Sequence, residues 1–150
     1  MIRQATFEDI DTIAEIGEKM FSESRWGIFD YDKDKVKRWL HYRMAHEQGI
    51  NFVAEKAGQL IGFFIGGWFY SYFGEFKRST DELLYVMPEH RGGTTGKKLI
   101  DAYVERAKEL NVDDICIGNS TGVKINSTAK LYEYCGFSQS GFNYFLRGDK

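Results

Sequence analysis

The sequence contains little cysteine, a single proline and no excess of positive charge. Its two cysteines, Cys116 and Cys135, have no paired spacing, which indicates reduced thiols in a cytoplasmic protein rather than a disulfide scaffold. The formal net charge of −2 gives little electrostatic reason to expect a long nucleic acid as partner. The longest apolar run, residues 60–70, is broken by glycines and is too short to cross a bilayer. The first residues also lack the apolar region of a signal peptide.

These absences point to a compact domain with neither a membrane nor a long nucleic acid as partner. A chain of 150 residues without linker or repeat is expected to form one domain over residues 1–150. Hydrophobic residues make up 43% of the chain, which is ample material for a core. The histidines, His41, His46 and His90, have no metal-ligand spacing with cysteines or carboxylates, so no metal site is expected.

The spacing of apolar residues predicts the secondary structure. Helices are expected over residues 10–21, 36–44, 99–110 and 127–135. Strands are expected over residues 2–5, 52–54, 60–69, 82–87, 112–117 and 142–146. The order β-α-α-β-β-β-α-β-α-β has three consecutive strands, which favour antiparallel pairing, and two later strand–helix units, which favour parallel pairing. The predicted fold class is therefore α/β, a mixed sheet with helices on its faces.

Short local signals support these boundaries. Thr6 followed by Asp9 resembles a capping box before the first helix, and Asp32 is placed to cap the second. Gly58 offers the positive φ of a hairpin turn between two strands. Gly136 stands where a glycine ends the last helix.

A glycine-rich loop, residues 91–96, lies between a predicted strand and the helix that follows it. Backbone N–H groups at a helix N-terminus have no intrahelical acceptor and bind anions, and glycines let a phosphate approach them closely. Arg91, Lys97 and Lys98 add positive charge at the same place. The loop lacks the first glycine and the Ser or Thr of a Walker phosphate loop, so the pattern favours a different diphosphate site.

The same segment resembles the acetyl-CoA-binding motif of the GNAT family of N-acetyltransferases, Arg/Gln-x-x-Gly-x-Gly/Ala. Arg91 matches its first position and Gly96 its last, while Thr94 stands where the family has the middle glycine. A second segment, residues 131–137, reads LYEYCGF and resembles the family signature Leu-Tyr-Glu-x-x-Gly-Phe. The element order is similar to that of the family over nearly the whole chain, and the specific residues lie in its C-terminal half.

The resemblance implies an enzyme that moves an acetyl group from acetyl-CoA, as acyl donor, directly to a primary amine. The amine acceptor is expected to be a small molecule or a peptide. Residues of the loop and of the two strands beside it are implied as cofactor-binding. They are Val86, Arg91, Gly92, Gly93, Thr94, Thr95, Gly96, Lys97 and Asn119.

Two catalytic residues are implied in the same way. Tyr132 is the candidate general acid, because the family's tyrosine lies near the sulfur of the coenzyme. Glu82 is the candidate general base for the amine, acting directly or through water. Strand parity puts Glu82 on the same side as Leu84 and Val86, facing the cofactor, and puts Asp81 on the other side. Core packing of the tyrosine ring and a solvent-facing glutamate are the structural alternatives.

Aromatic residues of two segments are candidates for the acceptor pocket, and a homodimer interface is the alternative use of the same surface. They are Trp26, Phe29, Tyr31, Trp68 and Tyr70. A route through an acyl-cysteine is disfavoured, because neither cysteine has an evident base. A non-catalytic acyl-CoA-binding domain and a protein-interaction domain on the same fold are the alternative functions.

Overall fold

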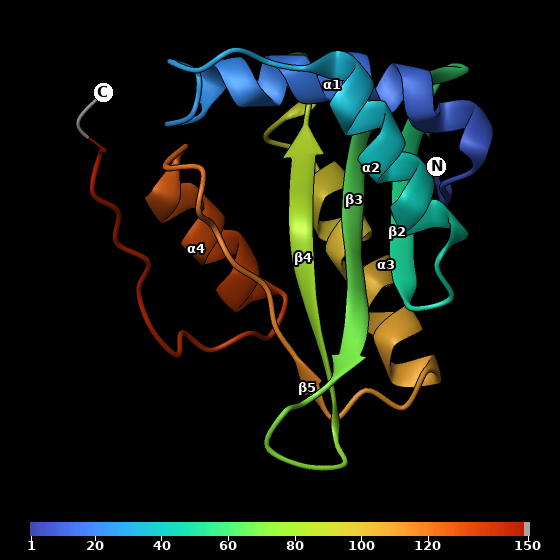
Figure 1. The fold of residues 1–150 in the computed structure, drawn as a ribbon, viewed down its shortest axis with the longest axis vertical. Helices are drawn as coiled ribbons and strands as arrows, with labels where there is room; N and C mark the ends of the chain where they lie inside the picture. Colours follow the sequence, from blue (N-terminus) through green and yellow to red (C-terminus); the bar gives the residue numbers. More distant parts are fainter. Residues whose placement is uncertain (149–150) are drawn as a thin grey trace.

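The computed structural model describes residues 1–148, and its centre is a five-stranded sheet (Figure 1). The strands are β1 (Ile2–Gln4), β2 (Gly49–Lys56), β3 (Gln59–Tyr70), β4 (Lys77–Val86) and β5 (Asp114–Ile115). They lie in the order β1-β2-β3-β4-β5. The first four pair antiparallel, and β5 joins β4 in parallel.

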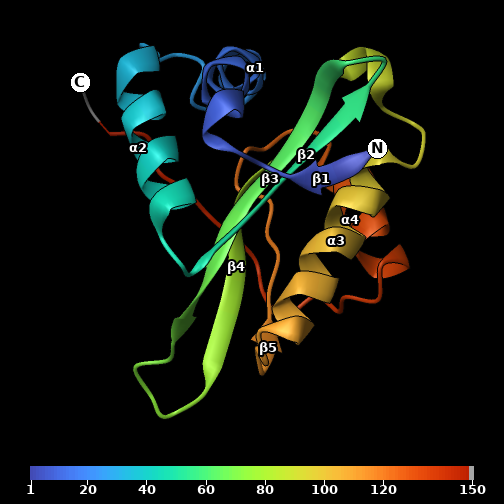
Figure 2. The ribbon, with the colours of Figure 1, turned by 90° about the vertical axis from the view of Figure 1, so that its right-hand side faces the viewer.

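Helices cover both faces of this sheet (Figure 2). On one face lie α1 (Ile10–Glu23) and α2 (Lys33–Ala45), and on the other lie α3 (Thr95–Glu109) and α4 (Ile125–Tyr134). Short 3-10 turns, Phe7–Asp9 and Pro88–His90, precede α1 and the glycine-rich loop. The predicted fold class, a mixed sheet flanked by helices, is confirmed. Among residues 1–148, no helix combines the length and the apolar character needed to cross a membrane.

The local signals of the sequence are confirmed at the element ends. The carboxylate of Asp9 accepts the Thr6 N–H at 2.8 Å, and that of Asp32 accepts the Lys35 N–H at 2.9 Å. Gly58 has φ of +75° in the turn between β2 and β3. Gly136 has φ of +95° just after α4, the left-handed conformation in which glycine commonly ends a helix.

Alternating residues of β3 bury their side chains in two separate core layers. Phe63 and Ile65 pack toward α1 and α2, while Phe64 packs toward α3. The ring of Phe64 stacks on that of Tyr103 of α3, with centroids 4.3 Å apart. Helices on both faces therefore explain why the sequence of β3 is apolar almost throughout, with a buried run from 61 to 67.

A β-bulge interrupts the pairing of β3 with β4 at Glu82. Ile65 pairs with Leu83, but the next residue, Gly66, pairs with Asp81. The extra residue reverses the alternation of side chains along β4. Glu82 and Leu83 consequently both face α1 and α2, whereas Asp81 faces the side of α3 and α4. The parity expected for Glu82 and Asp81 is therefore wrong, because it assumed an uninterrupted strand.

β4 and β5 stay together over a very short distance. Their parallel pairs are Arg78 with Asp114 and Ser79 with Ile115, and the last main-chain bond runs from Cys116 N–H to the Ser79 carbonyl at 2.9 Å. The strand predicted over 112–117 is thus reduced to two residues. Beyond this point β4 and the segment that follows β5 separate and leave an opening in the sheet.

The strand predicted over residues 142–146 is wrong. Residues 138–148 form neither helix nor strand, and the side chains of Phe142 and Leu146 are 73% and 96% exposed. The apolar alternation of this segment fits a strand, but a strand needs a neighbour to satisfy its backbone. β5 offers only two residues of edge, so the segment has no pairing partner within the described chain.

The buried hydroxyl of Tyr103 fixes the place where β4 and β5 separate. It donates to the Cys116 carbonyl at 2.7 Å and bonds to the Ser79 hydroxyl at 2.8 Å. We expect Tyr103→Phe to lower the free energy of unfolding by about 1–3 kcal/mol, because two buried polar groups lose their partner. Urea denaturation measures this change.

The matched control is Ser79→Ala in the Tyr103→Phe background. It removes the hydroxyl that the first substitution leaves unpaired, so it should recover part of the lost stability. An unchanged urea midpoint for Tyr103→Phe would contradict this role of the hydroxyl.

Candidate active site

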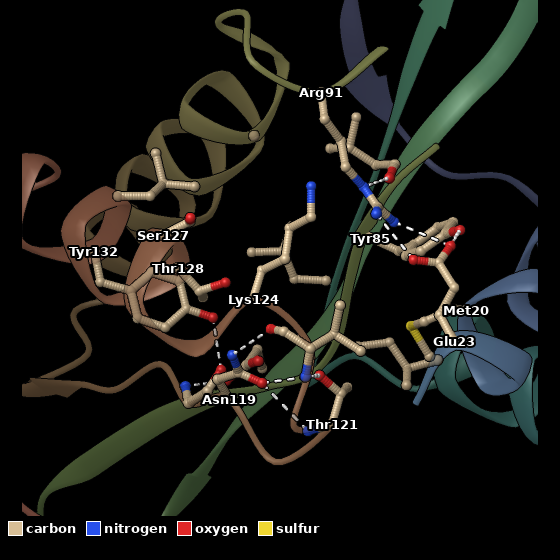
Figure 3. Close-up of a pocket in the computed structure, with 18 of the residues that line it drawn as sticks. Met20, Glu23, Tyr85, Arg91, Asn119, Thr121, Lys124, Ser127, Thr128 and Tyr132 are labelled. Carbon is tan, nitrogen blue, oxygen red and sulfur yellow. Dashed lines mark hydrogen bonds and ion pairs between the residues drawn. The ribbon is translucent and has the colours of Figure 1, made fainter. Parts of the chain in front are cut away.

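A cavity of about 460 Å³ occupies the opening beside β4 (Figure 3). One wall is formed by residues 81–86 of β4, and the opposite wall by residues 118–121, 123 and 124 and the inner side of α4. The glycine-rich loop closes one end, and the last turn of α1 borders the cavity with Met20 and Glu23. The cavity thus gathers the segments that carry both sequence motifs.

The glycine-rich loop presents open backbone to this cavity. Gly92 has φ of +82°, and a side chain at Gly92 or Gly93 would meet no atom within 4 Å. Thr94 has φ of −96°, a conformation that any residue adopts, so threonine replaces the family's glycine here without backbone strain. A Cβ at Gly96 would lie 3.2 Å from Leu131 Cδ2, so this glycine lets α3 pack closely against α4.

Not every predicted cofactor residue reaches the cavity. Most of the set lines it, but Thr94 and Thr95 do not. Thr94 acts as the N-cap residue of α3, where its carbonyl accepts the Lys98 N–H at 2.9 Å. The predicted residues that line the cavity are Val86, Arg91, Gly92, Gly93, Gly96, Lys97 and Asn119.

The Arg91 side chain turns away from the open loop and lies against β4 and α1. Its Nε donates to the Val86 carbonyl at 2.7 Å, and its two terminal nitrogens donate to the Glu23 carboxylate at 2.9 and 3.2 Å. The guanidinium also lies 5.0 Å from the centre of the Tyr85 ring. Arg91 therefore ties the loop to the end of α1, and the Val86 carbonyl is occupied by this contact.

Glu23 receives a third hydrogen bond, from the Tyr85 hydroxyl. Burial opposes ionisation of Glu23, but the bonds from Arg91 and Tyr85 outweigh it and hold its pKa below the usual range. Burial and the neighbouring carboxylate both raise the pKa of Tyr85, so its proton stays in place as a donor. The cluster is an ionised, internally satisfied contact between three elements.

The Gly118 peptide is held from both sides just beyond β5. Its N–H donates to Asp81 Oδ1 at 2.8 Å, and its carbonyl accepts the Tyr132 hydroxyl at 2.6 Å. Side chains thus replace the main-chain bonds that β4 and β5 no longer make. Burial raises the pKa of Asp81 and that of Tyr132, so the tyrosine is a hydrogen-bond donor with a strongly held proton.

Glu82 lines the cavity from a different direction. Its carboxylate pairs with Arg43 of α2 at 2.7 Å, and its side chain is 37% exposed. Burial raises its pKa, although Arg43 acts in the opposite sense. The bulge therefore sets two carboxylates side by side in the sequence, with Asp81 turned to Gly118 and Glu82 turned to α2.

The Asn119 side chain is used within its own loop. Its amide nitrogen donates to the Val123 carbonyl at 3.2 Å, and its oxygen accepts from the N–H and the hydroxyl of Thr121 at 3.2 and 2.9 Å. Arg25 holds the same loop to the segment after α1, because its Nε donates to the Ser120 carbonyl at 2.8 Å. Asn119 consequently shapes the wall on which it lies.

Of the five aromatic residues predicted for the acceptor pocket, Trp26 lines the cavity and the other four do not. The ring of Phe29 lies beside Arg147, and the Tyr31 hydroxyl donates to the Ala14 carbonyl at 2.7 Å within the core. Trp68 and Tyr70 lie near the opposite end of β4, where they pair with Ser79 and Lys77. The chain brings the two predicted segments to different ends of the sheet.

Several residues that line the cavity were not predicted from the sequence. Met20 lies on the predicted helix of residues 10–21, but Glu23 falls just after it, in a segment expected to be a loop, and Lys124 lies between two predicted elements. No sequence motif marks them, because their place depends on how α1 and α4 pack around β4. The one sequence signal for a contact between Glu23 and Arg91 is their opposite charge.

Comparisons with known proteins agree with this geometry. The family described as acetyltransferase (GNAT) domain matches residues 47–139, more than half of the chain. An uncharacterized N-acetyltransferase from Archaeoglobus fulgidus is 31% identical over 126 residues, which cover 79% of this chain and 82% of the relative.

Two solved structures share the fold. One is a predicted acetyltransferase with acetyl-CoA from Clostridium acetobutylicum, with a TM-score of 0.76 and 21% identity over 98% of this chain and 95% of the other. The second is a ribosomal-protein-alanine N-acetyltransferase from Brucella melitensis, with a TM-score of 0.73 and 20% identity over 99% of both chains. These two structures show a shared fold, whereas the family match and the archaeal relative show membership of the family. The chain belongs to the GNAT acetyltransferase family and is an acetyl-CoA-dependent acyltransferase.

Proposed function

We propose that residues 1–150 act as one domain that transfers the acetyl group of acetyl-CoA directly to a primary amine. The observation that carries the proposal is the composition of the cavity wall. Asp81 and Glu82 line it together with the Trp26 ring, and Glu82, whose side chain stays 37% exposed beside Arg43, is the carboxylate that an ammonium group can reach. Neither Cys116 nor Cys135 lines it, so within the described chain no thiol is placed to carry the acetyl group.

The donor fits the cavity with its diphosphate at the glycine-rich loop and its acyl end at Gly118. Gly92 and Gly93 leave the loop backbone open, as a phosphate requires. Val86 contributes an apolar wall, since its carbonyl is engaged by Arg91. Thr94 is the N-cap residue of α3 and Thr95 its first residue, and Asn119 holds the opposite wall in shape.

We assign Glu82 as the general base that removes a proton from the amine. An alkyl ammonium has a pKa of about 10.4, so the amine must lose a proton before its nitrogen attacks the thioester carbon. Glu82 faces α1 and α2, on the same side of β4 as Met20, and burial raises its pKa toward the working range of a base. Asp81 is committed to the Gly118 N–H and is a positioning residue in this scheme.

Tyr132 acts on the leaving sulfur. When the carbon–sulfur bond breaks, the electron pair goes to sulfur, whose thiol form has a pKa of about 8.5. Because burial raises the pKa of Tyr132 further above that value, full proton transfer to the thiolate is uphill. Its hydroxyl therefore stabilises the developing thiolate by a hydrogen bond, after leaving the Gly118 carbonyl.

The acceptor belongs to the class of small-molecule or peptide amines. The Brucella melitensis structure is described as an enzyme for a ribosomal-protein alanine, and another neighbour, with 14% identity, is described as an aminoglycoside acetyltransferase. Both descriptions name acceptors that carry amines. On the acceptor side, this chain offers one aromatic ring, Trp26, and the partly exposed carboxylate of Glu82.

Incubation of the protein with acetyl-CoA and a panel of amines tests this function. The panel contains amino acids, polyamines, aminoglycosides and peptides with free N-termini or lysines. We expect one class to gain an acetyl group by mass spectrometry, with one free thiol released per product. The double variant Cys116→Ser/Cys135→Ser should retain the activity. An acetylated cysteine as intermediate, or thiol release without an acetylated amine, would contradict direct transfer.

The base is tested by the pH dependence of kcat/KM in Glu82→Gln and Asp81→Asn. The base must be deprotonated, so the wild-type rate should fall as the pH falls through a pKa raised above the usual value of glutamate. Glu82→Gln should lower kcat/KM by about a hundredfold or more and remove this acid limb.

Asp81→Asn is the matched control, because its amide oxygen still accepts the Gly118 N–H. It should retain the acid limb with less than about a tenfold loss in rate. Loss of the limb in Asp81→Asn and its survival in Glu82→Gln would transfer the role of base to Asp81.

Substitution of Tyr132 by phenylalanine keeps the ring and removes the hydroxyl. We expect kcat to fall by about ten- to a hundredfold, because one donor to the developing thiolate is lost. Thermal titration with acetyl-CoA should show donor binding close to that of wild type. Unchanged turnover would show that the hydroxyl serves only to hold Gly118.

A further inference from the structure

Three long cationic side chains line the cavity near the glycine-rich loop, and two of them are already paired. Arg91 is held by Glu23 and by the Val86 carbonyl. Lys97 forms an ion pair with Asp101 one helical turn further along α3. Lys124 forms no hydrogen bond through its ammonium group and no ion pair with any residue from 1 to 148. Its charge helps to lower the pKa of Glu23 without direct contact, so among the three cations of the cavity Lys124 is the one whose ammonium group stays available to an anionic ligand.

Lys124 lines the cavity from an unusual backbone conformation. Lys124 has φ of +44° and ψ of +48° and precedes α4 as its N-cap residue. This left-handed conformation is unfavourable for a residue with a Cβ, and glycine or asparagine would adopt it more easily. Its side chain extends toward Arg91 and away from Asn119 (Figure 3).

We propose that Lys124 binds the diphosphate of the acetyl donor from the wall opposite the start of α3. The inference rests on the proposed donor site and adds a residue to it. The loop supplies backbone N–H groups, but its arginine is neutralised by Glu23, so the loop alone offers little net charge for two phosphate groups. An ammonium group on the facing wall completes the charge balance and closes the site around the phosphates.

Lys124 could instead bind a carboxylate on the acyl group or on the acceptor. The direction of its side chain favours the phosphates over such a carboxylate. In the proposed donor site the acyl end lies near Gly118, whose peptide group is bound by Asp81 and Tyr132. Lys124 extends the other way, toward the loop. A lysine for an acyl carboxylate would be expected beside Gly118 instead.

Thermal-shift titrations with acetyl-CoA and with S-acetylpantetheine, which lacks the phosphates, test this inference. The variants are Lys124→Met, which keeps the length of the side chain, and Lys124→Arg, which keeps the charge. The matched control is Lys130→Met, an equal change in charge at an exposed site of α4 outside the cavity. A shift in melting temperature follows the logarithm of ligand concentration over Kd, so weak ligands are measurable.

We expect Lys124→Met to raise the Kd of acetyl-CoA by about tenfold or more, and Lys124→Arg and Lys130→Met to bind nearly as wild type does. Binding of S-acetylpantetheine should be the same in all four proteins. Equal acetyl-CoA affinity in Lys124→Met and wild type would overturn the inference alone. Equal weakening of both ligands would also overturn it, by showing a change of cavity shape. Absence of acetyl-CoA binding to wild type would overturn the proposed donor site as well.

Discussion

The separation of β4 from β5 is the constraint on which the rest of the site depends. Two parallel pairs hold the strands together, and the hydroxyl of Tyr103 marks where their pairing ends. Beyond it, Asp81 and Tyr132 take over the two polar groups of the Gly118 peptide. A longer β5 would satisfy the same groups with main-chain bonds and close the opening. The sheet remains stable and open because side chains satisfy the backbone there.

The cofactor loop is fixed to the rest of the molecule by charge rather than by apolar packing. Gly92 and Gly93 offer no side chains to bury, so the loop depends on Arg91 for its position. Arg91 reaches the last turn of α1, where Glu23 stays ionised because Arg91 and Tyr85 donate to it. The arginine at the first motif position therefore pairs with Glu23, so in the proposed donor site the phosphates meet the backbone N–H groups and Lys124.

The loop, its helix and the Tyr132 segment were predictable because each is encoded by neighbours in sequence. Glycine spacing, a capping residue or a helical stripe is complete within about fifteen residues. The bulge at Glu82 was not predictable, since it is a property of the register between β3 and β4. The position of Glu23 in the cavity was not predictable for the same reason, since it depends on the packing of α1 beside β4. The strand over residues 142–146 was predicted wrongly because a strand needs a neighbour, which the described chain does not supply.

The bulge also sets the directions of the two neighbouring carboxylates, Asp81 and Glu82. In a regular strand, Asp81 and Glu82 would still point to opposite faces, but Glu82 would share the side of Leu84 and Val86, and Asp81 would face α2. The extra residue exchanges them. The shorter carboxylate then reaches the Gly118 N–H, while the longer one faces α1 and α2, the side from which we propose that the amine approaches. One residue inserted in β4 thus decides which carboxylate faces Gly118 and which faces α2, and the proposed mechanism assigns the first to the donor side and the second to the acceptor side.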